Sequence, residues 1–323
     1  MRLVMLGTGP FAVPTLQALA ASEHQVALVV TRPPRGRSQA ASPLQRAAES
    51  LLEVWLPESV NTQDSQAKLA SLGADLLVVC DYGEILRPAT LAAARLGGIN
   101  LHGSLLPKYR GAAPVQRAIL NGETETGNSV IQMTPGLDAG PCLGQQKTRI
   151  DSDEDAGQLE SRLAILGAEL VGRVLTELAA GTARPIEQDA RLASKAPRLA
   201  KEEGAIDWSR SALAIKNQVR ALVPWPRAFT FWHRAGGPPV RLNIDRVALA
   251  PSAPGEAASA RLGSPQAAAG PGAIVEATNR LLLATGDAAI DVLELQPAGK
   301  RAMSASEFLR GNRLGAGDRL GPA

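Results

Sequence analysis

Short apolar runs recur through the first 185 residues of the chain, and stretches with helical spacing separate several of them. The runs that predict strands are Leu3–Leu6, Val26–Val30, Leu76–Cys80, Ile99–Leu101 and Val130–Met133. The stretches that predict helices are Phe11–Ala21, Ser42–Leu52, Asp64–Leu72, Pro88–Leu96, Pro114–Leu120 and Asp155–Leu178. Such alternation is typical of a parallel sheet with helices on both faces, so we expect an α/β domain here.

The pattern changes after residue 185, which predicts a second domain. Residues 186–205 lose the regular apolar spacing and crowd charges together, as expected of a linker. A helical stretch follows at Ser211–Leu222, and the later strand-like runs are Ala228–Trp232, Val240–Ile244, Ala273–Glu276, Arg280–Ala284 and Ala289–Leu295. Residues 251–271 are rich in Ala, Ser, Gly and Pro, which predicts a mobile surface loop. The expected division is an α/β domain at 1–185, a linker at 186–205 and a small β-rich domain at 206–323.

Composition narrows the class of protein. The chain has 323 residues, of which 45% are hydrophobic and only 3% aromatic, so Ala, Leu and Val must supply most of the packing. Two cysteines, Cys80 and Cys142, make no disulfide framework and favour a reducing compartment. No apolar run reaches membrane-spanning length. Glycines and prolines interrupt the apolar N-terminus, so it reads as a strand, turn and helix rather than a secretion signal, and we expect a cytoplasmic protein.

Charge is distributed unevenly along the chain. Residues 1–185 carry 16 basic and 18 acidic side chains, a net charge of −2, whereas residues 186–323 carry 18 basic and 13 acidic ones, a net charge of +5. The interval between His24 and Ala48 has no acidic residue. Its arginines are Arg32, Arg35, Arg37 and Arg46. The excess of basic residues in this interval and in residues 186–323 permits a polyanionic partner.

The turn after the first predicted strand carries a phosphate-binding pattern. Gly7, Gly9 and Ala12 fit G-x-G-x-x-A, the turn of dinucleotide-binding enzymes. That pattern also needs an acidic residue at the end of the next strand, and the run Val26–Val30 is followed instead by Thr-Arg-Pro-Pro. We therefore expect no nicotinamide cofactor, although an arginine at that place leaves NADP as an alternative. The other interpretation is that the glycines let the backbone turn tightly at the sheet edge.

Another strand end carries groups suited to catalysis. Asn100 and His102 lie on the run Ile99–Leu101 and its end, and a side-chain period of two points them to the same face of an extended strand. A histidine exchanges its proton near neutral pH, and an amide is a neutral hydrogen-bond donor. Asp138 lies in the predicted loop after the run Val130–Met133. In α/β sheets ligands bind outside the carboxyl ends of the strands, so these three residues are candidates for one site.

An amide, an imidazole and a carboxylate together suit acyl transfer to an amine. Asn100 can donate to the carbonyl oxygen as its carbon becomes tetrahedral, and His102 can take the proton that the amine loses. Asp138 can orient the imidazole and stabilise the imidazolium. A hydrolase with Ser104 or Cys142 as nucleophile is a rival interpretation, but Ser104 lacks the G-x-S-x-G context and Cys142 lacks protease-like surroundings. No metal-ligand spacing surrounds His102, so no metal is expected.

These residues resemble a known family. The segment from Ile99 to Pro114 contains S-L-L-P-x-x-R-G-A-A-P, and Asp138 follows 36 residues after His102 in G-L-D-A-G. This combination resembles the folate-dependent formyltransferases, and the sequence of the motif is most similar to that of their methionyl-tRNA formyltransferase branch. Further motifs similar to that branch occur in the same order along the whole chain. They are Phe11-Ala-Val-Pro14, Asp207-Trp208, Pro224-Trp-Pro226 and the segment from Leu295 to Ser304.

The resemblance implies a fold, two substrates and a site. It implies a Rossmann-like formyltransferase domain followed by a C-terminal β-barrel of the OB type. It implies 10-formyltetrahydrofolate as the formyl donor and the amine of initiator methionyl-tRNA as the acceptor. Asn100, His102 and Asp138 are implied as the catalytic residues, and the loop of Ser104, Leu105, Leu106 and Pro107 is implied as part of the folate site. No nicotinamide, membrane or obligate protein partner is expected.

The chain departs from the family's usual sequence at three places. Gly9-Pro10 replaces a proline followed by an acidic residue, the loop from Thr31 to Pro43 is shorter than in some members, and Cys80-Asp81-Tyr82-Gly83 replaces a more apolar strand end. Formyl transfer to another amine and an NADP-binding Rossmann protein remain the alternative functions. With a tRNA as acceptor, we expect Arg32, Arg35, Arg37 and Arg46 to contact the acceptor arm, while the positively charged C-terminal domain holds the tRNA body.

Overall fold

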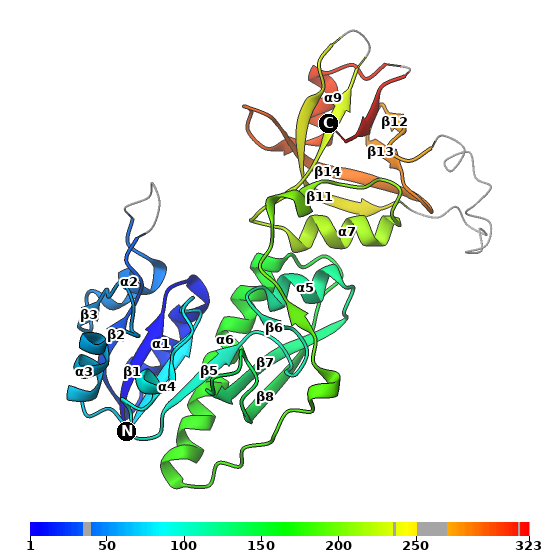
Figure 1. Ribbon diagram of the computed structural model, residues 1–323. Helices are drawn as coiled ribbons and strands as arrows, with labels where there is room; N and C mark the ends of the chain where they lie inside the picture. Colours follow the sequence, from blue (N-terminus) through cyan, green and yellow to red (C-terminus); the bar gives the residue numbers. More distant parts are fainter. Residues whose placement is uncertain (35–39, 235–236, 251–269, 316, 323) are drawn as a thin grey trace. The chain divides into compact units, whose positions relative to one another are not determined.

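A computed structural model describes residues 1–34, 40–234, 237–250, 270–315 and 317–322, and Figure 1 shows the arrangement of its helices and strands. The described chain divides into two compact units. The first comprises Met1–Val115, Thr124–Ile150 and Gln158–Arg198. The second comprises Gln116–Glu123, Asp151–Gly157 and Leu199–Ala323. Most of the segment predicted as a loop at residues 251–271 lies outside the described residues.

The first unit is built on a seven-stranded sheet with the order β3-β2-β1-β4-β5-β7-β8. Its strands are β1 (Arg2–Gly7), β2 (Gln25–Val30), β3 (Val54–Trp55), β4 (Leu76–Cys80), β5 (Gly98–His102), β7 (Glu125–Gln132) and β8 (Cys142–Arg149). The strands from β3 to β5 are parallel to their neighbours, as predicted. The sheet departs from the predicted parallel arrangement at one edge, where β7 pairs antiparallel with both β5 and β8.

Helices cover both faces of this sheet, as the alternating pattern predicts. They are α1 (Val13–Ala20), α2 (Pro43–Ala48), α3 (Gln63–Ser71), α4 (Pro88–Leu91) and α6 (Ala156–Ala180). A further helix, α5 (Pro114–Leu120), belongs from Gln116 onward to the second unit. On one face, Leu69 of α3 and Leu91 of α4 pack with the buried side chains of β1, β2 and β4. On the other face, Leu170 of α6 lies against Gly144 of β8. The ends of these helices follow local signals; Ser42 Oγ, for example, caps α2 by accepting from Gln45 N at 3.1 Å.

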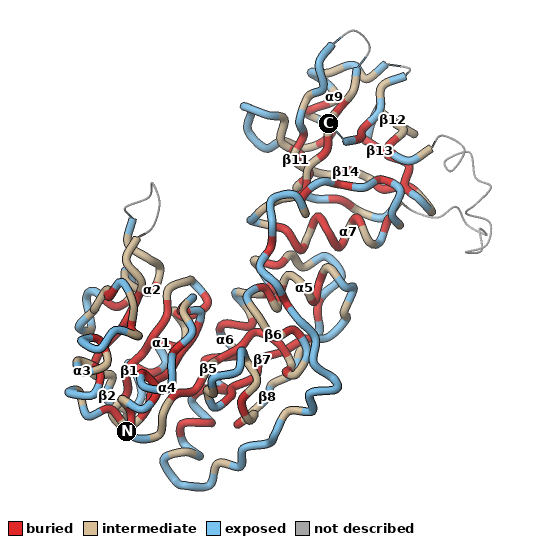
Figure 2. The backbone as a smooth tube through the Cα atoms, viewed as in Figure 1, coloured by how far each residue is buried: buried red, intermediate tan, exposed pale blue. Residues whose placement is uncertain are grey.

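The central strands β1, β4 and β5 are buried along nearly their whole length, which Figure 2 shows in red. Every residue from Leu3 to Leu6 and from Leu76 to Cys80 is buried. Continuous burial is typical of strands with helices on both sides, and each buried Leu or Val stabilises the unit by about 1.5–3 kcal/mol. The rigid strands of this core hold the residues that follow their carboxyl ends.

The second unit contains a small antiparallel barrel with the strand order β12-β13-β14-β11-β10-β16. Its strands are β10 (Ala228–His233), β11 (Val240–Leu249), β12 (Ile274–Ala277), β13 (Leu281–Ala284), β14 (Ala289–Pro297), β15 (Met303–Ser304) and β16 (Arg319–Gly321). An antiparallel bridge between Ala273 and Arg319 brings the two edges of the sheet together. Two helices, α7 (Ala212–Ala221) and α9 (Ala305–Gly311), pack against it, with Ile215 and Phe308 in its core. The predicted β-rich second domain is confirmed.

Candidate active site

The two candidate residues on β5 project from the middle of the first unit's sheet. In the register of the strands, Asn100 lies between Val79 of β4 and Ile131 of β7. His102 is the last residue of β5 and lies opposite Ser129. It is only 6% exposed, so its imidazole is enclosed by protein. The strand pleat places both side chains on the same face, as the spacing predicts.

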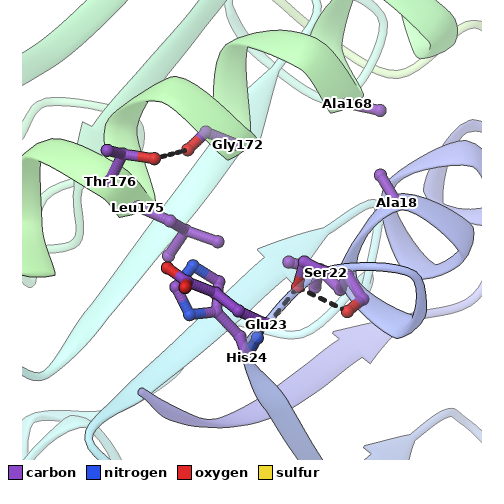
Figure 3. A pocket seen from close by; sticks show the side chains of 9 residues that line it. Ala18, Ser22, Glu23, His24, Ala168, Gly172, Leu175 and Thr176 are labelled. Atoms are coloured by element: carbon purple, nitrogen blue, oxygen red, sulfur yellow. Dashed lines mark hydrogen bonds between the residues drawn. The ribbon is translucent and has the colours of Figure 1, made fainter.

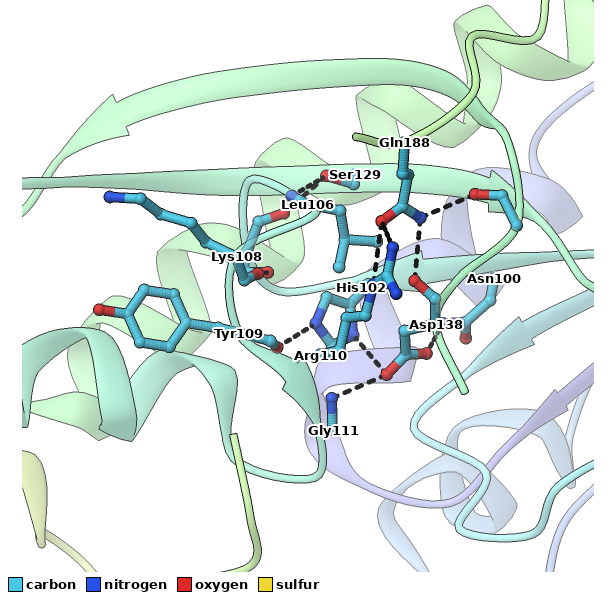
Figure 4. A network of polar contacts seen from close by, with 12 residues as sticks. Asn100, His102, Leu106, Lys108, Tyr109, Arg110, Gly111, Ser129, Asp138 and Gln188 are labelled. Carbon is cyan, nitrogen blue, oxygen red and sulfur yellow. Dashed lines mark hydrogen bonds and ion pairs between the residues drawn. The ribbon is translucent and has the colours of Figure 1, made fainter. Parts of the chain in front are cut away.

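Asp138 reaches the same place from the loop between β7 and β8 (Figure 4). Its Oδ2 lies 3.7 Å from His102 Nδ1. Its Oδ1 accepts a hydrogen bond from Asn100 Nδ2 at 3.5 Å, and Oδ2 accepts one from Gly111 N at 2.9 Å. The structure therefore brings the three residues together around one point at the carboxyl edge of the sheet.

A backbone carbonyl fixes the protonation of the neutral imidazole. His102 Nε2 lies 2.8 Å from the carbonyl oxygen of Tyr109. A carbonyl can only accept, so Nε2 carries the proton and the lone pair of the neutral ring is on Nδ1, the atom that faces Asp138. The Tyr109 carbonyl thus orients the ring, and the Asp138 carboxylate faces the atom that would gain a proton. Nothing in the sequence pattern points to Tyr109, since its backbone and not its side chain makes this contact.

The loop predicted to bind folate is fixed by bonds within the protein. Ser104 is fully buried, and Leu106 N donates to Ser129 Oγ at 3.0 Å. Gln145 Nε2 donates to the Leu106 carbonyl at 2.8 Å, and Ser194 N donates to the Pro107 carbonyl at 3.3 Å. Leu105 and Pro107 are half-buried. The loop therefore offers a ligand mainly apolar surface on a rigid frame.

The geometry gives little support to a covalent nucleophile. Ser104 Oγ donates to the Lys108 carbonyl at 2.6 Å, and His102 is committed to Tyr109 and Asp138. Burial raises the pKa of the Cys142 thiol, which disfavours the reactive thiolate. Among the described residues, no group of three or more His, Cys, Asp or Glu side chains is arranged to hold a metal ion.

A further carboxylate lies at the neighbouring strand end. Asp81 directly follows β4, and its carboxylate accepts from the backbone N–H of Gly9 in the turn after β1. A Cβ atom on residue 9 would collide with Asp81 Oδ2, so a side chain there would displace the Asp81 carboxylate from this position. Two of the departures from the family's usual sequence are therefore in contact. Asp81 is open to solvent, yet the surrounding protein atoms raise its pKa to about 6 by desolvation. In the sheet β2 and β4 lie on opposite sides of β1, so the carboxyl ends of β1 and β4 flank a topological switch point.

The four predicted tRNA-binding arginines are only partly described. Arg32 Nη1 donates to the Gly83 carbonyl at 2.6 Å, and Arg46 Nη1 donates to the Ala41 carbonyl at 2.5 Å. Arg35 and Arg37 lie outside the described residues.

A cavity of about 290 Å³ lies between the end of α1 and α6, and none of the three candidate residues lines it (Figure 3). His24 is on its wall, and its Nδ1 lies 3.2 Å from the N-terminal amino group. The third histidine, His233, contacts the Pro322 carbonyl through Nε2 at 2.6 Å. Both contacts are structural. Among the described helices, none is long and apolar enough to cross a membrane.

Comparisons with known proteins find relatives that match nearly the whole chain. A family model described as "Formyl transferase" matches residues 1–175, and one described as "Formyl transferase, C-terminal domain" matches residues 198–313. The chain is 44% identical to the methionyl-tRNA formyltransferase of Solibacter usitatus over 326 residues, covering 99% of both proteins. It is also 44% identical to the methionyl-tRNA formyltransferase of Rhodopirellula baltica over 341 residues, covering 99% of this chain and 96% of that protein.

A solved structure shares the fold at lower identity. The N-formyltransferase from Helicobacter canadensis, determined in complex with folinic acid and dTDP-3-aminofucose, superposes with a TM-score of 0.66 at 18% identity. The match covers 90% of this chain and 98% of that one. At this identity the likeness concerns the fold alone.

Proposed function

Because the chain belongs to the family of methionyl-tRNA formyltransferases, we propose that Asn100, His102 and Asp138 carry out its reaction. The enzyme transfers the formyl group of 10-formyltetrahydrofolate to the amino group of initiator methionyl-tRNA. The observation that carries the assignment is the convergence of an amide donor, an imidazole lone pair and a carboxylate at one strand end.

The reaction needs no covalent intermediate with the protein. The neutral methionine amine attacks the formyl carbon, and the developing oxyanion accepts a hydrogen bond from Asn100 Nδ2, a donor of the kind worth about 10²–10³ in rate. His102 Nδ1 takes the proton that the attacking nitrogen loses. The tetrahedral carbon then releases N10 of tetrahydrofolate, and N10 receives from the imidazolium the proton that the amine lost. General acid–base catalysis of this kind contributes about 10²–10⁴.

Asp138 and Tyr109 stabilise the charged form of His102 that exists between these two proton transfers. The imidazolium donates from Nε2 to the Tyr109 carbonyl and presents Nδ1–H to the Asp138 carboxylate. Asp138 is only 13% exposed, so the ion pair is little screened by water. The Gly111 N–H holds the carboxylate oxygen that faces the ring.

We assign the two substrates to different parts of the chain. The folate donor binds in the domain of residues 1–185 beside Ser104–Pro107, where Leu105 and Pro107 offer apolar surface for a flat ring. The domain of residues 206–323 holds the tRNA, and residues 186–205 connect the two. The net charge of +5 on residues 186–323 supports this division, since phosphate contacts dominate tRNA affinity. The reaction belongs in the cytoplasm, where initiator tRNA is charged.

We further propose that Arg32, Arg35, Arg37 and Arg46 contact the acceptor arm. Arg32 and Arg46 each make a bond to a backbone carbonyl, and a guanidinium has five N–H donors, so other donors of the group can meet phosphate oxygens. The absence of acidic residues between His24 and Ala48 favours an anionic partner for this part of the sequence.

The direct test supplies the purified protein with 10-formyltetrahydrofolate labelled in the formyl group and follows the label. We expect it in formylmethionine on charged initiator tRNA and not in uncharged tRNA. Transfer to an amino-sugar nucleotide or to glycinamide ribonucleotide, with none to methionyl-tRNA, would refute the assignment. Binding of NADPH, followed by its fluorescence, with no formyl transfer would identify a different class of protein.

A further inference from the structure

Residues 186–196, which the sequence predicts to be part of a linker, run along the loops that hold the active site; we call this segment the strap. At its start, Ile186 and Cys142 exchange two backbone hydrogen bonds of 2.7 and 2.8 Å. At its end, β9 (Lys195–Ala196) pairs in parallel with β6 (Arg110–Gly111). The strap belongs to the same compact unit as the active site. It is therefore attached to the first residue of β8 and to the segment after β5.

The side chain of Gln188 joins the strap to the Asp138 loop. Its Nε2 donates to the carbonyl of Asp138 at 2.9 Å and to that of Gly140 at 2.7 Å. Its Oε1 accepts from Arg110 Nε at 3.1 Å and Nη2 at 2.8 Å (Figure 4). Because carbonyls only accept and a guanidinium only donates, these partners fix the orientation of the amide. Both amide hydrogens of Gln188 are used on the backbone of the catalytic loop.

The Asp138 backbone needs such support. Its φ is 47°, in the left-handed region that residues other than glycine seldom adopt. Strain of this kind persists where surrounding contacts fix the backbone. The two Gln188 bonds hold carbonyls at Asp138 itself and two residues beyond it. A loop freed from them would let the carboxylate move away from His102 Nδ1.

The strap also holds the other side of the imidazole. Ser194 Oγ accepts from Tyr109 N at 2.9 Å, and the Ser194 carbonyl accepts from Arg110 N at 2.9 Å. Tyr109 is a second non-glycine residue in the left-handed region, with a φ of 64°. Its carbonyl orients His102 Nε2. The groups on both sides of His102 are thus fixed by one segment outside the predicted catalytic motifs.

We propose that the strap positions the catalytic loops and that Gln188 is a positioning residue that acts through Asp138. The inference rests on the proposed roles of Asp138 and His102. It predicts that Gln188 affects the rate of the chemical step more than the affinity for either substrate. If Gln188 merely stabilised the fold, its replacement would lower the free energy of unfolding without this selective effect on the chemical step.

The test is a double-mutant cycle on the full-length enzyme with labelled 10-formyltetrahydrofolate and methionyl-tRNA. Gln188→Met keeps the side-chain length but removes the donors, and Asp138→Asn removes the charge while keeping a residue that tolerates a left-handed backbone. We expect Gln188→Met to lower kcat roughly tenfold to hundredfold, since a 1 Å misplacement costs about 10², with both KM values within about twofold. In the Asp138→Asn background the same change should lower kcat less than about threefold. The exposed neighbour provides the control, Glu187→Ala, which should leave kcat unchanged.

Two results would overturn the inference and leave the proposed function intact. One is a folded Gln188→Met enzyme with parental kcat, and the other is an equal loss of kcat in the parent and Asp138→Asn backgrounds. Gln188→Glu is measured alongside, because a carboxylate keeps the acceptor for Arg110 but cannot donate to the two carbonyls. It should lower kcat in the same way if Gln188→Met fails to fold, and parental kcat in Gln188→Glu would then overturn the inference. Near-parental kcat in Asp138→Asn alone would instead refute the proposed catalytic role.

Discussion

Gly111→Ala is expected to disable the enzyme by displacing the backbone at residue 111, although the substitution removes no side chain. Gly111 has a φ of 131°, which side-chain-bearing residues rarely adopt, and a Cβ there would lie 2.5 Å from the Ala196 carbonyl oxygen of the strap. The strain is worth about 1–3 kcal/mol. Relief requires β6 to move from β9, which also carries away the Gly111 N–H that bonds Asp138 Oδ2 at 2.9 Å. A hydrogen bond to an ionised group contributes about 1.5–3 kcal/mol, so the two effects together favour a displaced loop.

We expect the single-turnover rate of formyl transfer by Gly111→Ala to fall by about 10², as for a misplacement of about 1 Å. Rates are measured with enzyme in excess over methionyl-tRNA, and folding is checked by urea unfolding. Gly181→Ala is the matched control, because Gly181 also has a positive φ, 68°, but a Cβ there would meet nothing within 4 Å. Gly181→Ala should lose stability but not rate. A Gly111→Ala enzyme with a rate within twofold of the parent would refute the reasoning.

Folate analogues should slow hydrogen exchange in the Ser104–Pro107 loop, and unchanged exchange at saturating analogue would argue against a donor site there. Combined Arg35→Ala and Arg37→Ala substitutions should weaken methionyl-tRNA binding and make log affinity less steeply dependent on log salt, by somewhat under one per lost contact. An unchanged slope would leave recognition to the C-terminal domain. Asp81 has its pKa raised from 3.8 to about 6, so its contribution to stability is complete below about pH 3.8 and is lost as the pH rises through 6. The difference in free energy of unfolding between Asp81→Asn and the parent should therefore grow in favour of the variant from pH 4 to pH 7, by about 1 kcal/mol once solvent screening is allowed for. Equal gains at both pH values in urea unfolding would contradict this.

The sequence predicts the elements whose apolar residues are frequent, and it misses those that are short or polar. β8 was not predicted because Leu143 is the one large aliphatic residue of Cys142–Arg149, while its other positions alternate between half-buried and exposed. α9 was missed although Ser304 and Glu307 form a capping box, since the helix has only seven residues. β7 runs antiparallel to β5, against the predicted parallel arrangement, and the helix that precedes it, α5, belongs from Gln116 onward to the second unit.

In the candidate site, too, the sequence predicts some features and misses others. The spacing of Asn100 and His102 on a strand end, and of Asp138 in the next strand-end loop, was visible in the sequence because side-chain type and period carry that information. The contacts that hold these three side chains in place could not be predicted from the sequence. The carbonyl of Tyr109 has no side-chain signature, and Gln188 meets backbone groups 50 and 48 residues away in the sequence. Only the fold brings such groups together.

The most direct test of the account is the rate of formyl transfer by His102→Ala, measured in a single turnover with 10-formyltetrahydrofolate and initiator methionyl-tRNA. Loss of the imidazole removes the acceptor of the amine proton, so we expect a rate about 10²–10⁴ below the parent, with folding and folate binding preserved. Adding Asp138→Ala to this variant should lower the rate little further, because the carboxylate acts on the imidazolium. A folded His102→Ala enzyme that formylates methionyl-tRNA at nearly the parental rate would contradict the account.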